Sequence, residues 1–289
     1  MTHLFCFGLG YSSGYVARDL AALGWRISGT STHAEGAAQL NARGYHGFVF
    51  DGRTHTDEIA AALQSATHVL LSIPPDAAGD PALNVFGEDI AASPSISWIG
   101  YFSTVGVYGD TAGGWVDEDT PALPASDRGK RRLNAETAWL SLGGRASKAI
   151  MVFRLPGIYG PGRSTLDDLR SGEARRIVKS GQVFNRIHVE DIAAAVEAGV
   201  AMPHAGSVYN VTDNEPAPPQ DVVAFGAELL GLPVPPDLDF ETTTLTPMAR
   251  SFYSESKRVS NTRLKSELGL TLKHPSYRDG LRAILRGGG

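Results

Sequence analysis

The chain has 289 residues, 42% of them hydrophobic, which is enough to bury the core of a large α/β domain with an additional lobe. Its formal net charge is -5, and it carries neither a basic tail nor a long run of one charge. This pattern gives no electrostatic reason to bind nucleic acid or an anionic membrane surface, so we expect a small molecule as the ligand.

The cysteine content and the lack of two kinds of sequence pattern, a secretory signal and a long apolar stretch, indicate the cellular setting. Cys6 is the only cysteine, so no intramolecular disulfide can form, and its apolar surroundings indicate a buried structural thiol. The first residues lack the pattern of a secretory signal, and no stretch reaches the roughly 20 apolar residues that span a bilayer. We therefore expect a cytoplasmic protein without a membrane partner.

Short apolar strands alternate with amphipathic helices over the first half of the chain. The pattern predicts strands at 4–8, 26–31, 47–51, 68–73, 96–103 and 149–154, and helices at 15–23, 33–42, 57–66, 80–92 and 128–142. Such alternation is typical of a parallel sheet covered on both faces, so the predicted fold class is α/β with a doubly wound (Rossmann) sheet. The sequence leaves the oligomeric state open, although the helices at 80–92 and 128–142 could form the two-fold bundle of a homodimer.

Prolines become frequent after residue 154 and break the chain into short pieces. We therefore expect residues 1–158 to form the nucleotide-binding domain and residues 159–289 to form mainly a smaller substrate-binding lobe. Residues 187–212 are the exception. They are expected to return to the main sheet as a strand at 187–189, a helix at 191–200 and a strand at 208–211.

The first strand runs directly into residues 8–14, Gly-Leu-Gly-Tyr-Ser-Ser-Gly. Glycines in such a turn let the backbone approach a pyrophosphate, which then faces free N–H groups and the positive end of a helix dipole. Gly8 and Gly10 fit these roles, but Ser13 stands where G-x-G-x-x-G has its third glycine, so the fingerprint is imperfect. The alternative is an ordinary glycine turn. The expected cofactor contacts here are Gly8, Gly10, Tyr11, Ser12 and Ser13.

The end of the second strand favours NADP over NAD. NAD-binding sites usually place Asp or Glu about 20 residues after the first glycine, where it holds the ribose hydroxyls. This chain has Thr30, Ser31 and Thr32 there, which can donate to a 2′-phosphate, although they could also cap the next helix and no arginine accompanies them. We expect NADP, with NAD as the alternative. Further contacts are expected at the ends of the next two strands, from Asp51, Ser72, Ile73 and Pro74.

Five segments together resemble the short-chain dehydrogenase/reductase superfamily, in its extended epimerase/dehydratase-like branch. They are the turn at 8–14, Ser-Thr-Val-Gly-Val-Tyr-Gly at 103–109, Arg-Leu-Pro-Gly-Ile-Tyr-Gly-Pro-Gly at 154–162, Arg-Ile-His-Val-Glu-Asp at 186–191, and the closing Leu-Gly at 268–269 with Tyr-Arg-Asp-Gly-Leu at 277–281. The resemblance covers nearly the whole chain. It implies that Thr104 polarises the reacting oxygen of a substrate and that backbone near Pro156 and Gly157 contacts the nicotinamide ring. It also implies a packing role for His188.

The chain departs from this family at the catalytic Tyr-x-x-x-Lys, whose positions hold Arg128 and Arg132. An arginine keeps its proton up to a pKa above roughly 12, so Arg128 cannot be the general acid or base. Arg132 could still hold the cofactor ribose, although its planar fork makes the exchange non-conservative. The proton would then come from water or from a residue that the sequence does not identify, and Tyr108, four positions after Thr104, is the best candidate among the residues. The sequence therefore resembles an atypical member of the family.

Basic residues gather near the start of the helix at 128–142 and again between residues 163 and 186. We hypothesise that they bind a substrate that carries a carboxylate or a phosphate, with contacts from Arg128, Arg163 and Arg176. The alternative is that each is a solvated surface charge.

Two functions remain open from the sequence. The first is an NADP-dependent oxidoreductase or epimerase that acts on an anionic small molecule without the usual Tyr/Lys pair. The second is a non-catalytic NADP(H)-binding sensor or interaction protein, for which the missing tyrosine is the direct argument. No metal site is expected, because the eight histidines form no H-E-x-x-H or comparable spacing with the carboxylates.

Overall fold

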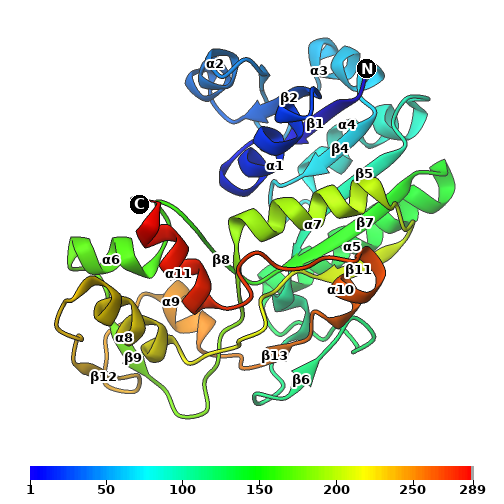
Figure 1. Ribbon diagram of the computed structural model, residues 1–289. Helices are drawn as coiled ribbons and strands as arrows, with labels where there is room; N and C mark the ends of the chain where they lie inside the picture. The colour runs from blue at the N-terminus through cyan, green and yellow to red at the C-terminus, as the bar shows by residue number, and fades with distance from the viewer. Residues whose placement is uncertain (288–289) are drawn as a thin grey trace.

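The computed structural model describes residues 1–287 and contains a central sheet of seven parallel strands (Figure 1). Their order across the sheet is β11-β7-β5-β4-β1-β2-β3. The strands are β1 (His3–Phe7), β2 (Arg26–Ser31), β3 (His46–Val49), β4 (His68–Leu71), β5 (Trp98–Thr104), β7 (Ala149–Leu155) and β11 (Ser207–Asn210). Chain order reverses between β1 and β4, where a doubly wound sheet binds ligands beyond its carboxyl ends. The predicted fold class is confirmed.

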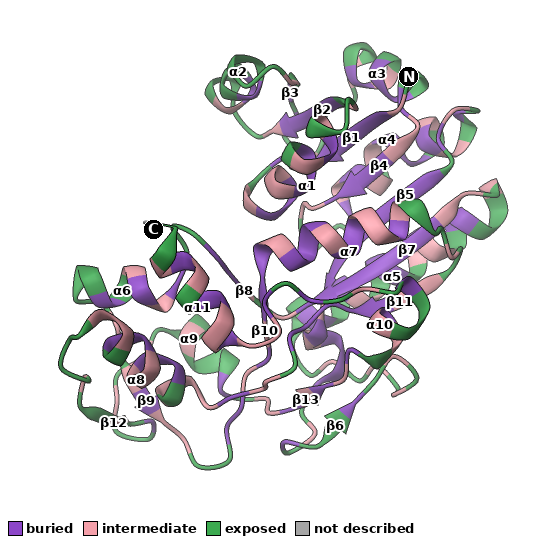
Figure 2. Cartoon of the chain, in the orientation of Figure 1, coloured by how far each residue is buried: buried purple, intermediate pink, exposed green. Residues whose placement is uncertain are grey.

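Helices cover both faces of this sheet. One face is packed by α1 (Tyr11–Ala22), α2 (Ala34–Ala42) and α7 (Val189–Ala201), and the other by α3 (Asp57–Ser65), α4 (Pro81–Ala92) and α5 (Asp127–Ala146). Along β5, Trp98 and Phe102 face the first layer and Ile99 and Tyr101 the second, as the two-residue period of a strand requires. The central strands are therefore buried on both sides, as Figure 2 shows.

Side-chain caps fix where the helices of the second layer begin. Asp80 accepts a hydrogen bond from the N–H of Leu83 at 3.0 Å, and Ser126 accepts one from the N–H of Gly129 at 3.1 Å. The helices predicted at 80–92 and 128–142 therefore lie close to their observed positions. The helix predicted at 15–23 begins earlier, at Tyr11, because the polar first turn of α1 carries no apolar periodicity that a sequence pattern could detect.

The smaller lobe has its own apolar cluster, formed around Tyr159, Leu166, Tyr277 and Leu281. Its elements are β8 (Gly157–Tyr159), α6 (Thr165–Ser171), β9 (Arg176–Val178), β10 (Arg186–His188), α8 (Pro219–Leu230), β12 (Asp237–Asp239), α9 (Pro247–Phe252) and α11 (Tyr277–Arg286). Residues 288 and 289 of the expected lobe lie outside the described residues. Within residues 1–287, no helix combines the length and the apolar character that crossing a membrane requires.

The segment expected to return to the main sheet does so only in part. β11 joins the edge of the sheet beside β7, α7 packs against α1, and α10 (Thr262–Leu268) packs against both α7 and β11. The strand expected at 187–189 was placed wrongly, because β10 pairs with β8 in a separate two-stranded sheet. Another short pair, β6 (Trp115–Val116) with β13 (Arg258–Val259), follows η1 (Val105–Tyr108).

Candidate functional site

The glycine turn between β1 and α1 lies at the point where the strand order reverses. Gly8 has a φ of +82°, and a Cβ atom there would lie 2.6 Å from Cγ2 of Ile73, so only glycine lets the two strand ends come this close. A Cβ atom on Gly10 would meet no other atom within 4 Å. The backbone of Gly10 is therefore accessible to a ligand from the carboxyl edge of the sheet.

Ser13, which replaces the third glycine of the fingerprint, holds this turn together. Its hydroxyl accepts a hydrogen bond from the N–H of Gly10 at 2.9 Å and donates one to the carbonyl oxygen of Gly8 at 2.7 Å. Gly10 precedes α1 and supplies no side-chain cap, so the N–H groups of the first helical turn are left for another acceptor. Together with the positive end of the helix dipole, they form an anion-binding site.

Thr30 stabilises the glycine turn through two hydrogen bonds. Its hydroxyl accepts a hydrogen bond from the N–H of Gly8 at 2.8 Å, its carbonyl oxygen accepts one from Leu9 at 3.0 Å, and its side chain is buried. Thr30 therefore does not face a ligand as the sequence suggested. At the end of the same strand, Ser31 is half-buried and Thr32 is exposed, so these two remain open to contact with a ligand.

Two further loops line the same edge of the sheet. Ser72 donates its N–H to the carbonyl oxygen of Phe7 at 2.9 Å, which places Ser72, Ile73 and Pro74 directly beside the glycine turn. Asp51 lies farther along, beyond the end of β3, and is exposed. Hydrogen bonds from the backbone N–H groups of Thr54 and Arg53 hold the pKa of Asp51 below its usual range, so Asp51 is a carboxylate at neutral pH.

Thr104 ends β5 on the other side of the reversal point. Its hydroxyl oxygen accepts a hydrogen bond from the N–H of Gly106 at 3.1 Å and caps η1, which leaves the hydroxyl proton free to be donated. Thr104 is paired with Leu155 of β7, so Pro156 and Gly157 follow at the same edge. The structure therefore brings Thr104 and this segment together, as the sequence motifs implied.

Tyr108 cannot be the proton donor, because its hydroxyl is fully engaged inside the protein. It donates to Oδ1 of Asn210 at 2.9 Å and accepts from the guanidinium of Arg154 at 2.9 Å, and the side chain is 2% exposed. Burial raises the pKa of Tyr108, and the nearby Arg154 only partly opposes this. The sequence-based expectation for Tyr108 is therefore wrong.

Arg154 is the centre of a buried network that the sequence analysis missed. Its guanidinium forms a bidentate ion pair with the carboxylate of Glu136 in α5, from Nη2 to Oε2 at 2.7 Å and from Nε to Oε1 at 3.1 Å. The hydroxyl of Ser103 donates to the same carboxylate. The network links β5, β7, α5 and, through Asn210, β11. A charged residue within an otherwise apolar strand was the signal that could have revealed it, because such a charge requires a partner.

The two arginines at the Tyr-x-x-x-Lys positions lie in different environments. Arg128 is exposed in the first turn of α5, which packs on η1 through Gly129. Arg132 is buried, donates to the carbonyl oxygen of Phe102, and lies 5.7 Å from the ring centre of Tyr101. Arg132 thus supports the end of β5 through one N–H of its guanidinium, and its contact with the cofactor ribose stays a prediction.

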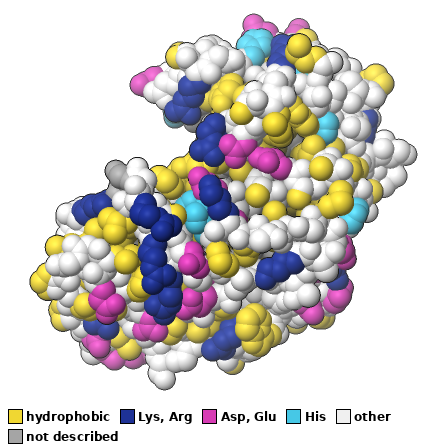
Figure 3. Space-filling model, viewed as in Figure 1, with side chains coloured by type: hydrophobic (Ala, Val, Ile, Leu, Met, Phe, Trp, Pro, Cys, Tyr) yellow, Lys and Arg dark blue, Asp and Glu magenta, His cyan; other side chains and the backbone are white. Residues whose placement is uncertain are grey.

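The two basic residues of the smaller lobe that were expected to bind the substrate also lie in different environments. Arg176 forms an ion pair with Asp237 at 2.7 Å and donates to the carbonyl oxygen of Pro235 at 2.9 Å, so it joins β9 to β12 instead of facing a substrate. Arg163 is exposed, and its guanidinium lies 5.7 Å from the ring centre of Tyr11. Figure 3 shows a notch between the two lobes, with Lys and Arg side chains along the smaller lobe beside it.

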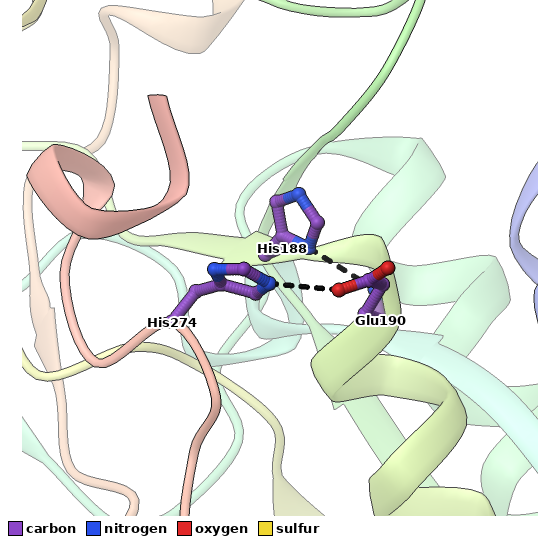
Figure 4. Close-up of side chains that lie close together, drawn as sticks. All are labelled: His188, Glu190 and His274. Carbon is purple, nitrogen blue, oxygen red and sulfur yellow. Dashed lines mark hydrogen bonds and ion pairs between the residues drawn. The ribbon is translucent and has the colours of Figure 1, made fainter. Parts of the chain in front are cut away.

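His188 takes part in a cluster that joins α7 to the segment before α11 (Figure 4). Its Nδ1 caps α7 by accepting a hydrogen bond from the N–H of Glu190 at 3.3 Å, and Nε2 of His274 lies 2.9 Å from the Glu190 carboxylate. These three side chains are close enough to hold a metal ion, but the ammonium group of Lys273 already contacts the same carboxylate oxygen at 2.6 Å. Burial lowers the pKa of His188 to about 4, so its ring is neutral and serves packing.

No protein-family model matches the chain. A solved structure described as a functionally unknown conserved protein from Silicibacter pomeroyi DSS is 48% identical, covers 100% of this chain and 99% of its own, and has a TM-score of 0.90. The 3-diazoavenalumate denitrifying reductase of Streptomyces sp is 29% identical over 180 residues, 58% of this chain and 55% of that protein.

A more distant structure identifies the fold. The dTDP-glucose 4,6-dehydratase of Bacillus anthracis str. Ames, solved in complex with NAD, is 16% identical, covers 99% of this chain and 96% of its own, and has a TM-score of 0.80. The chain therefore belongs to one family with the Silicibacter pomeroyi protein, and it shares the fold of the dTDP-glucose 4,6-dehydratase.

Proposed function

We propose that this protein is an NAD(P)-dependent oxidoreductase of the epimerase/dehydratase type that acts on an anionic small molecule. The observation that carries the proposal is the glycine turn at the reversal point of the sheet, with open space in front of Gly10 and an uncapped first turn of α1. The bound NAD of the dTDP-glucose dehydratase structure, which shares this fold, supports a nicotinamide dinucleotide as the ligand.

We infer a preference for NADP from the end of β2. Ser31 and Thr32 remain available there, and residues 28–33 at the end of the strand include no carboxylate that would repel a 2′-phosphate. The related Streptomyces protein is described as a reductase, which supports redox chemistry over simple binding. When bound, the nicotinamide ring would supply or accept a hydride.

The residues of the chain would orient the substrate and stabilise its charge. Thr104 would donate its free hydroxyl proton to the reacting atom of the substrate, beside the backbone of Pro156 and Gly157. Arg128, exposed in the first turn of α5, would attract an anionic group. Because the hydroxyl of Tyr108 is engaged and a guanidinium does not act as a general acid, the proton of a reduction would come from water.

The second candidate function is that of a non-catalytic NADP(H) sensor. It is favoured by one observation, namely that the two positions of the family's acid/base pair hold an exposed arginine and an arginine bound to a backbone carbonyl. Both functions require dinucleotide binding, so only turnover distinguishes them.

Turnover is tested by following NADPH absorbance with a panel of anionic carbonyl compounds and nucleotide sugars. In Thr104→Ala, loss of the hydroxyl should lower kcat by about 100-fold while the Kd for NADPH stays unchanged. The matched control is Thr137→Ala, because the Thr137 hydroxyl is exposed and bonds only within α5. Tight NADPH binding without turnover of any substrate would favour the sensor, and no dinucleotide binding at all would refute both functions.

The role of Thr30 gives a second prediction. Thr30→Val removes the acceptor of the Gly8 N–H and should destabilise the fold by about 1–3 kcal/mol. The affinities for NADPH and NADH should fall by the same factor, because the turn that binds their common diphosphate is disturbed. Calorimetric titration of both cofactors measures this, with Thr32→Val as the control that should change the NADPH/NADH ratio. A selective loss of NADPH affinity in Thr30→Val would mean that Thr30 reads the 2′-phosphate directly.

A further inference from the structure

A short loop of the smaller lobe lies against the glycine turn of the nucleotide-binding domain. After β8 the chain makes a tight turn, closed by hydrogen bonds from the N–H of Gly160 to the carbonyl of Arg163 at 3.1 Å and from the N–H of Arg163 to the carbonyl of Gly160 at 3.0 Å. The hydroxyl of Tyr11 donates to the carbonyl oxygen of Pro161 at 3.1 Å. Residues 160–163 thus touch the first residue of α1.

This contact depends on a close approach that only glycine permits. A Cβ atom on Gly160 would lie 2.5 Å from the hydroxyl oxygen of Tyr11 and 2.6 Å from Cγ1 of Val189. Gly162 has a φ of +71°, which lets the loop turn back toward Arg163. The local sequence is therefore suited to holding Arg163 at the N-terminal end of α1.

The charge of Arg163 has no carboxylate partner among the described residues. Arg176 and Arg278 of the same lobe pair with Asp237 and Glu215, at 2.7 and 3.1 Å. By contrast, the guanidinium of Arg163 lies near only the ring of Tyr11 among the described side chains. The carboxylate of Asp167 instead accepts hydrogen bonds from the N–H and the hydroxyl of Ser164, at 2.8 and 2.6 Å.

The exposed guanidinium of Arg163 lies close to a helix end of the same sign, because it is 5.7 Å from the ring centre of Tyr11, the first residue of α1. The N-terminal end of α1 carries a partial positive charge, and its first turn has no side-chain cap. An anion between the helix end and the guanidinium would satisfy both groups at once. A diphosphate fits best, because a guanidinium can bind two phosphate oxygens in parallel.

We propose that Arg163 binds the diphosphate of the dinucleotide, and that the loop at 160–163 closes over it by means of Tyr11. This inference rests on the proposed function, since it assigns one more contact to the same cofactor. It also changes the role of Arg163, which the sequence placed on the substrate. The smaller lobe then contributes to cofactor binding.

The test compares cofactor affinities of charge variants by calorimetry. Arg163→Gln should raise the Kd for NADPH and for NADH by about the same factor, roughly tenfold, because both carry the diphosphate. The dependence of the Kd on salt concentration should become weaker, since one ionic contact is lost. Arg163→Lys keeps the charge but not the two parallel N–H donors of the guanidinium, so its Kd should lie between those of the wild type and Arg163→Gln. The control is Arg43→Gln, an exposed arginine at the end of α2, which should bind both cofactors as the wild type does.

The possible results separate this inference from the proposed function. Unchanged affinity and salt dependence in Arg163→Gln, with a melting temperature like that of the wild type, would overturn the inference and leave the proposed function standing. A higher KM for the substrate with an unchanged cofactor Kd would overturn it too, by returning Arg163 to the substrate. Absence of dinucleotide binding in the wild-type protein would refute the proposed function itself.

Discussion

Arg154→Leu should lower the free energy of unfolding by about 3–5 kcal/mol, because it leaves the buried carboxylate of Glu136 without its partner. The same change removes the donor that Tyr108 accepts from. Urea denaturation measures the loss. The double variant Arg154→Leu/Glu136→Leu should lose less stability than Arg154→Leu, because no unpaired charge then remains in the core.

An exposed ion pair between α5 and α4 provides the control. Arg145 contacts Glu88 at 3.4 Å, and both side chains are largely exposed. Arg145→Leu should therefore cost only about 0–1 kcal/mol. If Arg154→Leu cost no more than Arg145→Leu, the buried network would not hold β5, β7 and α5 together. Thr104 would then lose the rigid support that its position next to Ser103 implies.

Gly10→Asp should strongly weaken dinucleotide binding while slightly stabilising the fold. A Cβ atom at this position meets no other atom within 4 Å, and aspartate is a favourable residue at the start of a helix. Its carboxylate would occupy the N–H groups that the diphosphate requires and would repel the phosphate charge. We expect affinity to fall by about 100-fold, or about 2.8 kcal/mol of binding free energy. Stability should rise by a few tenths of a kcal/mol.

The control for charge is Ala22→Asp, at the exposed last residue of the same helix. It adds the same charge to the protein but leaves the glycine turn intact, so cofactor affinity should stay near that of the wild type. The melting temperature and the calorimetric Kd are both read for the two variants. Wild-type affinity in Gly10→Asp would place the diphosphate elsewhere and would remove the main support for the proposed function.

The sequence by itself determined the fold class and the position of the glycine turn. Both depend on local patterns, since apolar strands alternate with helices and glycines stand where a strand meets a helix. The replacement of the catalytic pair by Arg128 and Arg132 was likewise visible from the residues alone.

Only the tertiary structure decided what the individual side chains contact. Tyr108 is bound by Arg154 and Asn210, residues 46 and 102 positions away, so no local pattern could have shown that its hydroxyl is engaged. The inward direction of Thr30 and the approach of Arg163 to Tyr11 depend in the same way on partners that are distant in sequence. Local periodicity fixes which face a residue lies on, whereas its hydrogen-bond partner depends on how separate elements pack together.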